Sequence, residues 1–142
     1  MAFLEKSNWV VLVVGVPTIV IYLALVVPQL LAMPAADVAW VPPMLFAVVG
    51  FIVANVVGNI VAAIANPSEA DKNDERDKEI DRFGDWVGNW LIIAGAFVAL
   101  VLAMIEVDQF WIGNAIFLGG IVGSLVSSAT KIAAYHGPFQ RW

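Results

Sequence analysis

Long apolar stretches alternate with short polar segments along this chain. The apolar stretches cover residues 9–31, 44–65, 86–105 and 110–134. Each has roughly the 20 residues that a helix needs to cross a hydrocarbon core of about 30 Å. Because lipid offers no hydrogen bonds to the backbone, an isolated apolar segment crosses it as a helix. The pattern predicts an all-α fold, a four-helix transmembrane bundle that forms a single integral membrane domain over residues 1–142.

The polar segment between the second and third stretches is predicted to be a charged helix over 67–85. Asn66 and Glu69 have the spacing of a helix-capping pair at its start. Asp74 and Lys78 are four residues apart, which places opposite charges side by side on a helix. The residues predicted to form a cytoplasmic interaction surface on it are Asp74, Glu75, Arg76, Asp77, Lys78 and Arg82.

The basic residues predict the topology of the four spans. All seven Lys and Arg residues fall on one side of the predicted membrane: Lys6, Lys72, Arg76, Lys78, Arg82, Lys131 and Arg141. The connections on the other side, 33–43 and 106–109, carry only acidic charges. Since basic residues near helix ends are retained in the cytoplasm, we expect both termini and the charged helix to be cytoplasmic. The expected location is a prokaryotic plasma membrane, which the chain crosses several times.

Composition agrees with a membrane protein and excludes several other classes. The chain is 61% hydrophobic and 13% charged, against about half and about a quarter in soluble domains. The net charge of −5 argues against a nucleic-acid partner, which requires a basic surface. The chain has no Cys, and His136 is its one histidine, so neither thiolate chemistry nor a standard metal site is expected. We therefore predict no cofactor, no metal, no catalytic residues and no enzyme activity.

A few polar and small residues interrupt the apolar stretches. Asn55 and Asn59 are four residues apart and share one helix face, which must avoid lipid because an unpaired amide there costs on the order of several kcal/mol. Asn89 and Asn114 add two further amides. The fourth stretch also carries a strip of small residues that comprises Gly119, Gly123, Ser124, Ser127 and Ser128.

Two functions fit these residues. The first is a small integral membrane protein that acts by helix-mediated association, as a homo-oligomer or as an accessory subunit of a membrane complex, since small residues let helices approach closely. The alternative is a channel or uncoupled transporter for an ion or small solute, lined by Asn55, Asn59, Ser124 and Ser128. No ionisable residue lies in the predicted middle of any span, which disfavours a proton-driven pump.

The two halves of the chain also show a short internal similarity. Residues 50–55 align with 119–124, and 22–26 with 97–101. One interpretation is a tandem repeat of two helical hairpins. The other is that apolar sequence of low complexity matches itself by chance.

The charged segment also carries a resemblance to known sequences. The run Asp74-Glu75-Arg76-Asp77-Lys78-Glu79-Ile80, followed by an apolar span, resembles a family of small bacterial and archaeal membrane proteins of unknown function. In that family an Asp-Glu-Arg run leads into a transmembrane helix. The resemblance covers about residues 70–105 and implies a multi-span prokaryotic membrane protein without implying an activity.

Overall fold

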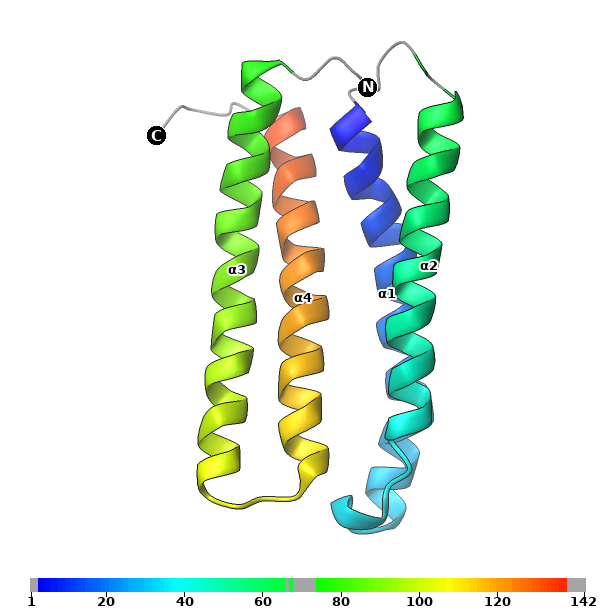
Figure 1. Cartoon of the computed structure of the whole chain (residues 1–142), viewed down its shortest axis with the longest axis vertical. Helices are drawn as coiled ribbons and strands as arrows, with labels where there is room; N and C mark the ends of the chain where they lie inside the picture. The colour runs from blue at the N-terminus through cyan, green and yellow to red at the C-terminus, as the bar shows by residue number, and fades with distance from the viewer. Residues whose placement is uncertain (1–2, 66, 68–73, 138–142) are drawn as a thin grey trace.

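The protein is a bundle of four long helices. The computed structural model describes residues 3–65, 67 and 74–137. Its elements are α1 (Phe3–Ala32), the 3₁₀ helix η1 (Ala35–Asp37), α2 (Val41–Ala65), α3 (Glu75–Met104) and α4 (Gln109–His136) (Figure 1). All four α-helices are long and apolar enough to cross a membrane, and the described residues contain no strand. The predicted all-α four-helix bundle is confirmed.

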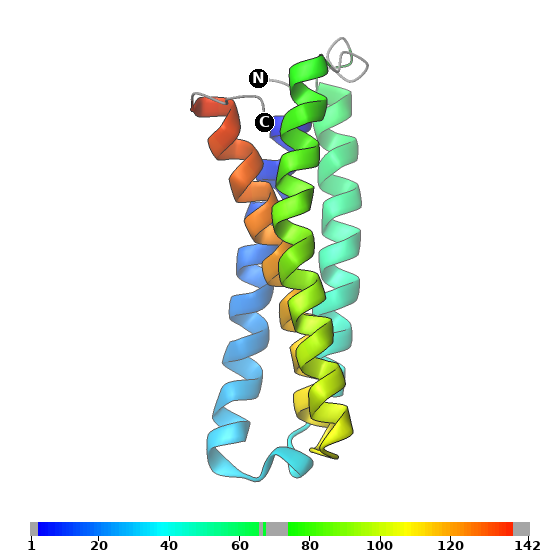
Figure 2. The same ribbon diagram turned by 90° about the vertical axis from the view of Figure 1, so that its left-hand side faces the viewer.

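The bundle consists of two antiparallel hairpins, α1–α2 and α3–α4, that lie side by side (Figures 1 and 2). The closest packing is between α3 and α4, and α4 also packs along α1. Within the described part of the chain, α2 has no extensive contact with α3 or α4. The hairpins are therefore joined mainly through α1 and α4.

The up-and-down connectivity gives the bundle two distinct ends. We call the end where α1 and α3 begin, and where α2 and α4 end, the basic end (Figure 1). The opposite, loop end carries η1 and the turn 105–108. The described basic residues lie at or near the basic end: Lys6, Arg76, Lys78, Arg82 and Lys131. The described Lys and Arg residues thus gather at one end of the bundle, as predicted. The cytoplasmic orientation of this end stays a prediction.

A capping box marks the start of α3. The Asp74 carboxylate accepts a hydrogen bond from the backbone N–H of Glu75 at 2.7 Å. In return, the Asp77 carboxylate accepts one from the backbone N–H of Asp74 at 3.2 Å. Such reciprocal bonds satisfy donors that a helix start otherwise leaves unpaired. The predicted cap formed by Asn66 and Glu69 lies outside the described residues.

The charged helix and the third span form one continuous helix. Of the predicted helical range 67–85, Pro67 lies in a turn, residues 68–73 lie outside the described part of the chain, and α3 begins at Glu75 after the capping box. From there α3 runs unbroken for 30 residues, which is about 45 Å at 1.5 Å per residue. This exceeds a hydrocarbon core of about 30 Å, so the charged first turns can extend beyond it.

A compact apolar cluster closes the loop end. Its buried members are Tyr22, Val26, Val38 and Phe110. The Tyr22 hydroxyl also donates a hydrogen bond to Oδ1 of Asn114, which links α1 to α4. We call these four apolar residues the loop-end cluster.

Glycines bring α3 and α4 into backbone contact. A Cβ atom added at Gly88 would lie 2.6 Å from the carbonyl oxygen of Gly123, and one at Gly95 would lie 2.7 Å from Cα of Gly119. Neither distance leaves room for a side chain. This part of the small-residue strip on α4 is therefore used for packing inside the chain.

Candidate functional site

A cleft lined by polar side chains lies between the helices in the basic half of the bundle. Its volume is about 400 Å³. Every α-helix contributes to its lining, which consists of Leu4, Ser7, Asn8, Val11, Phe51, Asn55, Asn59, Asp81, Asp85, Ser124, Ser127, Ser128 and Lys131. We call this the polar cleft. Such a concentration of polar groups between apolar helices marks it as the candidate site.

Three charged residues form the most polar part of the cleft. The Nζ atom of Lys131 lies 2.6 Å from Oδ1 of Asp81 and 2.6 Å from Oδ1 of Asp85. The two aspartates are one turn apart on α3, so both carboxylates reach the same ammonium group. Gly84 lies between them, and an added Cβ there would overlap the Lys131 side chain. These three charged residues, hereafter the charged triad, carry a formal net charge of −1.

Burial differs sharply within the charged triad. The Lys131 side chain is 9% exposed, whereas those of Asp81 and Asp85 are 41% and 55% exposed. The lysine is thus enclosed by its partners, while carboxylate oxygens remain accessible. Ser127 supports one of them, because its hydroxyl donates to Oδ1 of Asp85 at 3.3 Å. A ligand that enters the cleft meets hydrogen-bond acceptors of negative charge.

The amides of α2 also present acceptors. Nδ2 of Asn55 donates to the carbonyl of Phe51, and Nδ2 of Asn59 donates to the carbonyl of Asn55, both at 2.8 Å. Oδ1 of Asn55 is buried and has no hydrogen-bond partner among the described residues. Leaving a buried acceptor unpaired costs about 1–3 kcal/mol, which a bound donor would offset.

The structure brings together five of the residues that the sequence singles out. Asn55, Asn59, Ser124, Ser127 and Ser128 all line the polar cleft. These are the residues of α2 and α4 that were predicted to form a polar pathway or to pack helices. Because all five line one cavity, the polar pathway and the helix packing would both be located at this cavity.

Other predicted site residues lie elsewhere. Asn89 is exposed on α3 and does not line the polar cleft, so its predicted role in helix packing or a polar pathway stays a prediction. Asn114 is buried, but it pairs with Tyr22 near the loop end, away from the polar cleft. Gly119 and Gly123 lie in the contact between α3 and α4.

Sequence reasoning missed five polar residues of the cleft: Ser7, Asn8, Asp81, Asp85 and Lys131. Lys131 was taken as a residue at the end of the fourth span, yet it is buried among other helices. A signal was available, because a lysine inside an apolar stretch demands an anionic partner. Asp81 and Asp85, four residues apart on the neighbouring helix, are the acids that could have been matched to it.

The predicted cytoplasmic interaction surface lies on the first turns of α3. Its exposed members are Asp74, Glu75, Arg76, Lys78 and Arg82, while Asp77 is half-buried. His136 is the last residue of α4, and its Nε2 atom lies 3.5 Å from Oε1 of the buried Glu5. A role of this surface in binding a partner stays a prediction.

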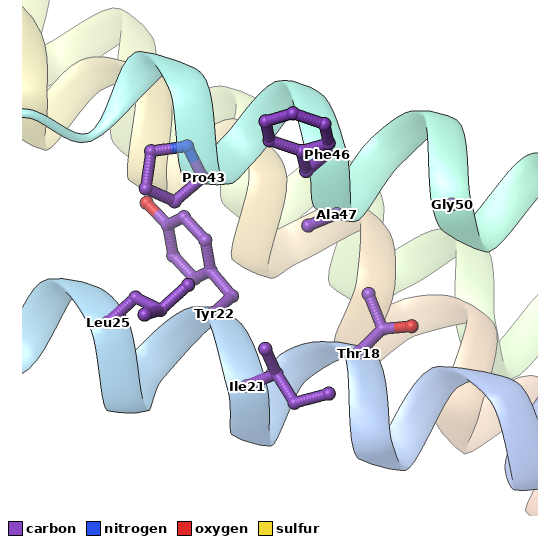
Figure 3. Close-up of a pocket in the computed structure, with 8 residues that line it drawn as sticks. All are labelled: Thr18, Ile21, Tyr22, Leu25, Pro43, Phe46, Ala47 and Gly50. Atoms are coloured by element: carbon purple, nitrogen blue, oxygen red, sulfur yellow. The ribbon is translucent and has the colours of Figure 1, made fainter.

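A second groove lies between α1 and α2 and differs in character from the polar cleft. Its volume is about 150 Å³, and Figure 3 shows its lining residues Thr18, Ile21, Tyr22, Leu25, Pro43, Phe46, Ala47 and Gly50. The Thr18 hydroxyl donates to the carbonyl of Val14 within its own helix, so little unpaired polarity faces the groove. A lipid chain suffices to cover such an apolar surface.

The described residues offer no ready metal site. No group of three or more Asp, Glu or His side chains among them is arranged to hold a metal ion. The carboxylates of the charged triad are already neutralised in part by Lys131.

No protein-family model, curated protein or solved structure matches this chain. The family resemblance of the charged segment therefore stays a prediction. What can be said of function depends on the geometry of the polar cleft.

Proposed function

We propose that this membrane protein is an uncoupled transporter for a small polar solute or ion, and that the polar cleft is its binding site. The observation that carries the proposal is a cleft of about 400 Å³ lined by polar side chains from all four helices. Polar groups inside a membrane are costly and are retained where they contact one another, water or a transported solute.

The closed loop end favours a transporter over a channel. The loop-end cluster and the Tyr22–Asn114 hydrogen bond join α1 to α4 on the side of the bundle away from the polar cleft. For a solute to leave the cleft on the other side, we infer that the contacts between α1 and α4 at the loop end separate. Movement of one helical hairpin against another around a central site is how many transporters alternate access.

Flux through reconstituted protein tests the proposal. Liposomes that contain the full chain would be assayed with potassium, methylammonium and glycerol as probes. We expect Asn55→Leu to slow the flux of the accepted probe about tenfold to a hundredfold, since hydrogen bonds to charged groups contribute about 1.5–3 kcal/mol.

The matched control for this test is Val56→Leu, the next residue on α2, whose side chain is 54% exposed. It changes a surface that faces lipid and should leave the flux unchanged. Equal flux through both variants, or no flux of any probe above protein-free liposomes, would contradict the proposal.

Association with other helices is a second candidate, and α2 supports it. Among the described residues, none on α2 is buried, and α2 contacts mainly α1. A second copy, or another membrane subunit, packed against α2 would enclose the open side of the bundle. Native mass spectrometry of protein extracted gently from its own membrane tests this function, and a monomer without bound subunits would count against it.

A further inference from the structure

An apolar chamber adjoins the polar cleft. Its volume is about 270 Å³, and its lining consists of Val48, Phe51, Ile52, Ile92, Ile116, Phe117, Gly120, Ile121 and Ser124. Phe51 and Ser124 line both cavities, so the two are adjacent. We call this second cavity the apolar chamber. Together the cavities are polar towards the basic end and apolar towards the middle of the bundle, and their size is that of a small-molecule site.

The chamber lies where the bundle is least closed. Its walls come from α2 on one side and from α3 and α4 on the other. Because α2 has no extensive contact with α3 or α4, a chain-like apolar group can enter between the hairpins from the surrounding lipid.

Hydrogen-bonding groups in the polar cleft define the complementary ligand. The Nδ2 atoms of Asn55 and Asn59 and the hydroxyl of Ser124 already donate to backbone carbonyls. The Lys131 ammonium is held by two carboxylates. Among the acceptors of the cleft, the half-exposed carboxylates of Asp81 and Asp85 are accessible to a ligand, whereas the unpaired Oδ1 of Asn55 is buried. A ligand that donates hydrogen bonds and carries positive charge matches this set.

We propose that the ligand of the cavity is a cationic amphiphile, in which a primary ammonium group occupies the polar cleft and an alkyl chain occupies the apolar chamber. This inference rests on the proposed function and specifies its substrate class. The net charge of −1 on the charged triad favours a cation over an anion. A small hydrophilic cation would leave the chamber unfilled, and a quaternary ammonium has no N–H to donate to the carboxylates of Asp81 and Asp85.

The test is native mass spectrometry of the full chain in a nonionic detergent, titrated with octylammonium, octyltrimethylammonium, octanol and ethylammonium. We expect octylammonium to bind with a stoichiometry of one. It should bind about tenfold more tightly than octyltrimethylammonium or octanol, because its N–H groups are charged donors that can pair with the exposed carboxylates of Asp81 and Asp85. Ethylammonium should bind more weakly still, since it leaves the chamber empty.

Two glycines supply a matched pair of variants. A Cβ atom at Gly120, which lines the apolar chamber, meets no atom within 4 Å, and the same holds at Gly50, which lines the other groove. Gly120→Leu should therefore fold and fill the chamber, which would weaken octylammonium binding at least about tenfold and leave ethylammonium unaffected. Gly50→Leu should change neither.

The outcomes separate this inference from the proposed function. Equal binding of ethylammonium and octylammonium, or an unchanged affinity in Gly120→Leu, would overturn the amphiphile while a polar solute site stands. Failure of every ammonium compound to bind, together with absent flux, would overturn both. Phosphatidylethanolamine carries the same ammonium group, so displacement of octylammonium by this lipid, and not by phosphatidylcholine, would support the inference and identify a membrane lipid as its source.

Discussion

The Nζ atom of Lys131 on α4 lies 2.6 Å from Oδ1 of Asp85 on α3, and 46 residues separate the two in the chain. The same nitrogen also holds Asp81. The contact ties the two helices of one hairpin together at the basic end. It also places the three charges of the triad at the basic end of the cleft, where a solute that enters from the basic end would meet them first.

Removing the lysine from the charged triad should destabilise the bundle. Lys131→Met leaves two carboxylates one turn apart without their shared cation. Because both are about half exposed, we expect a loss of about 1–3 kcal/mol, below the cost of breaking a fully buried pair. Thermal unfolding in detergent measures it.

The control for this change removes all three charges. The triple variant with Asp81→Asn, Asp85→Asn and Lys131→Met no longer opposes like charges and should recover most of the stability. A Lys131→Met protein as stable as the parent would show that the triad contributes nothing to folding.

A side chain at Gly88 should destabilise the protein, because α3 and α4 pack closely there. In Gly88→Leu the added Cβ atom would lie 2.6 Å from the carbonyl oxygen of Gly123 and 2.7 Å from Cβ of Ser127. Such overpacking costs about 1–3 kcal/mol or more. Gly120→Leu is the control, because its Cβ meets open space. Equal unfolding midpoints for the two variants would refute the glycine contact.

The hydrogen bond between Tyr22 and Asn114 should stabilise the loop end. Tyr22→Phe keeps the aromatic packing but leaves Oδ1 of Asn114 without its donor, so we expect a loss of about 1 kcal/mol. Thr18→Val on the same helix removes a hydroxyl that donates to the backbone carbonyl of Val14 in α1, so the loss of stability should be smaller. Denaturant unfolding compares the two, and a larger loss in Thr18→Val would contradict the prediction.

The topology predicted from basic residues can be tested with single cysteines, since the chain has none. Lys78→Cys places a thiol at the basic end and Asp108→Cys one at the loop end. In intact cells a membrane-impermeant maleimide should label Asp108→Cys alone. Lys78→Cys should become labelled only after the membrane is opened, and labelling of Lys78→Cys from outside would reverse the topology.

The positions of the helices could largely be predicted from the sequence, whereas the polar cleft could be predicted only in part. Asn55 and Asn59 were expected to face away from lipid because they share a helix face, and both line the cleft. Asn89 has no such partner on its face, and it is exposed on α3. One amide among apolar residues does not indicate which side of its helix meets a neighbour.

By itself, the sequence determined the number of helices, their approximate limits and the end at which the described basic residues gather. These properties are local, since lipid forces an apolar stretch of about 20 residues into a helix whatever its neighbours are.

Only the tertiary structure decided which helices pair and which faces meet. It placed Lys131 against Asp81 and Asp85, Gly88 against Gly123, and left α2 open to its surroundings. The physical reason is that these helices are apolar on most sides. Between such helices in lipid, association depends on close packing and a few polar contacts, which hydropathy along the chain does not encode.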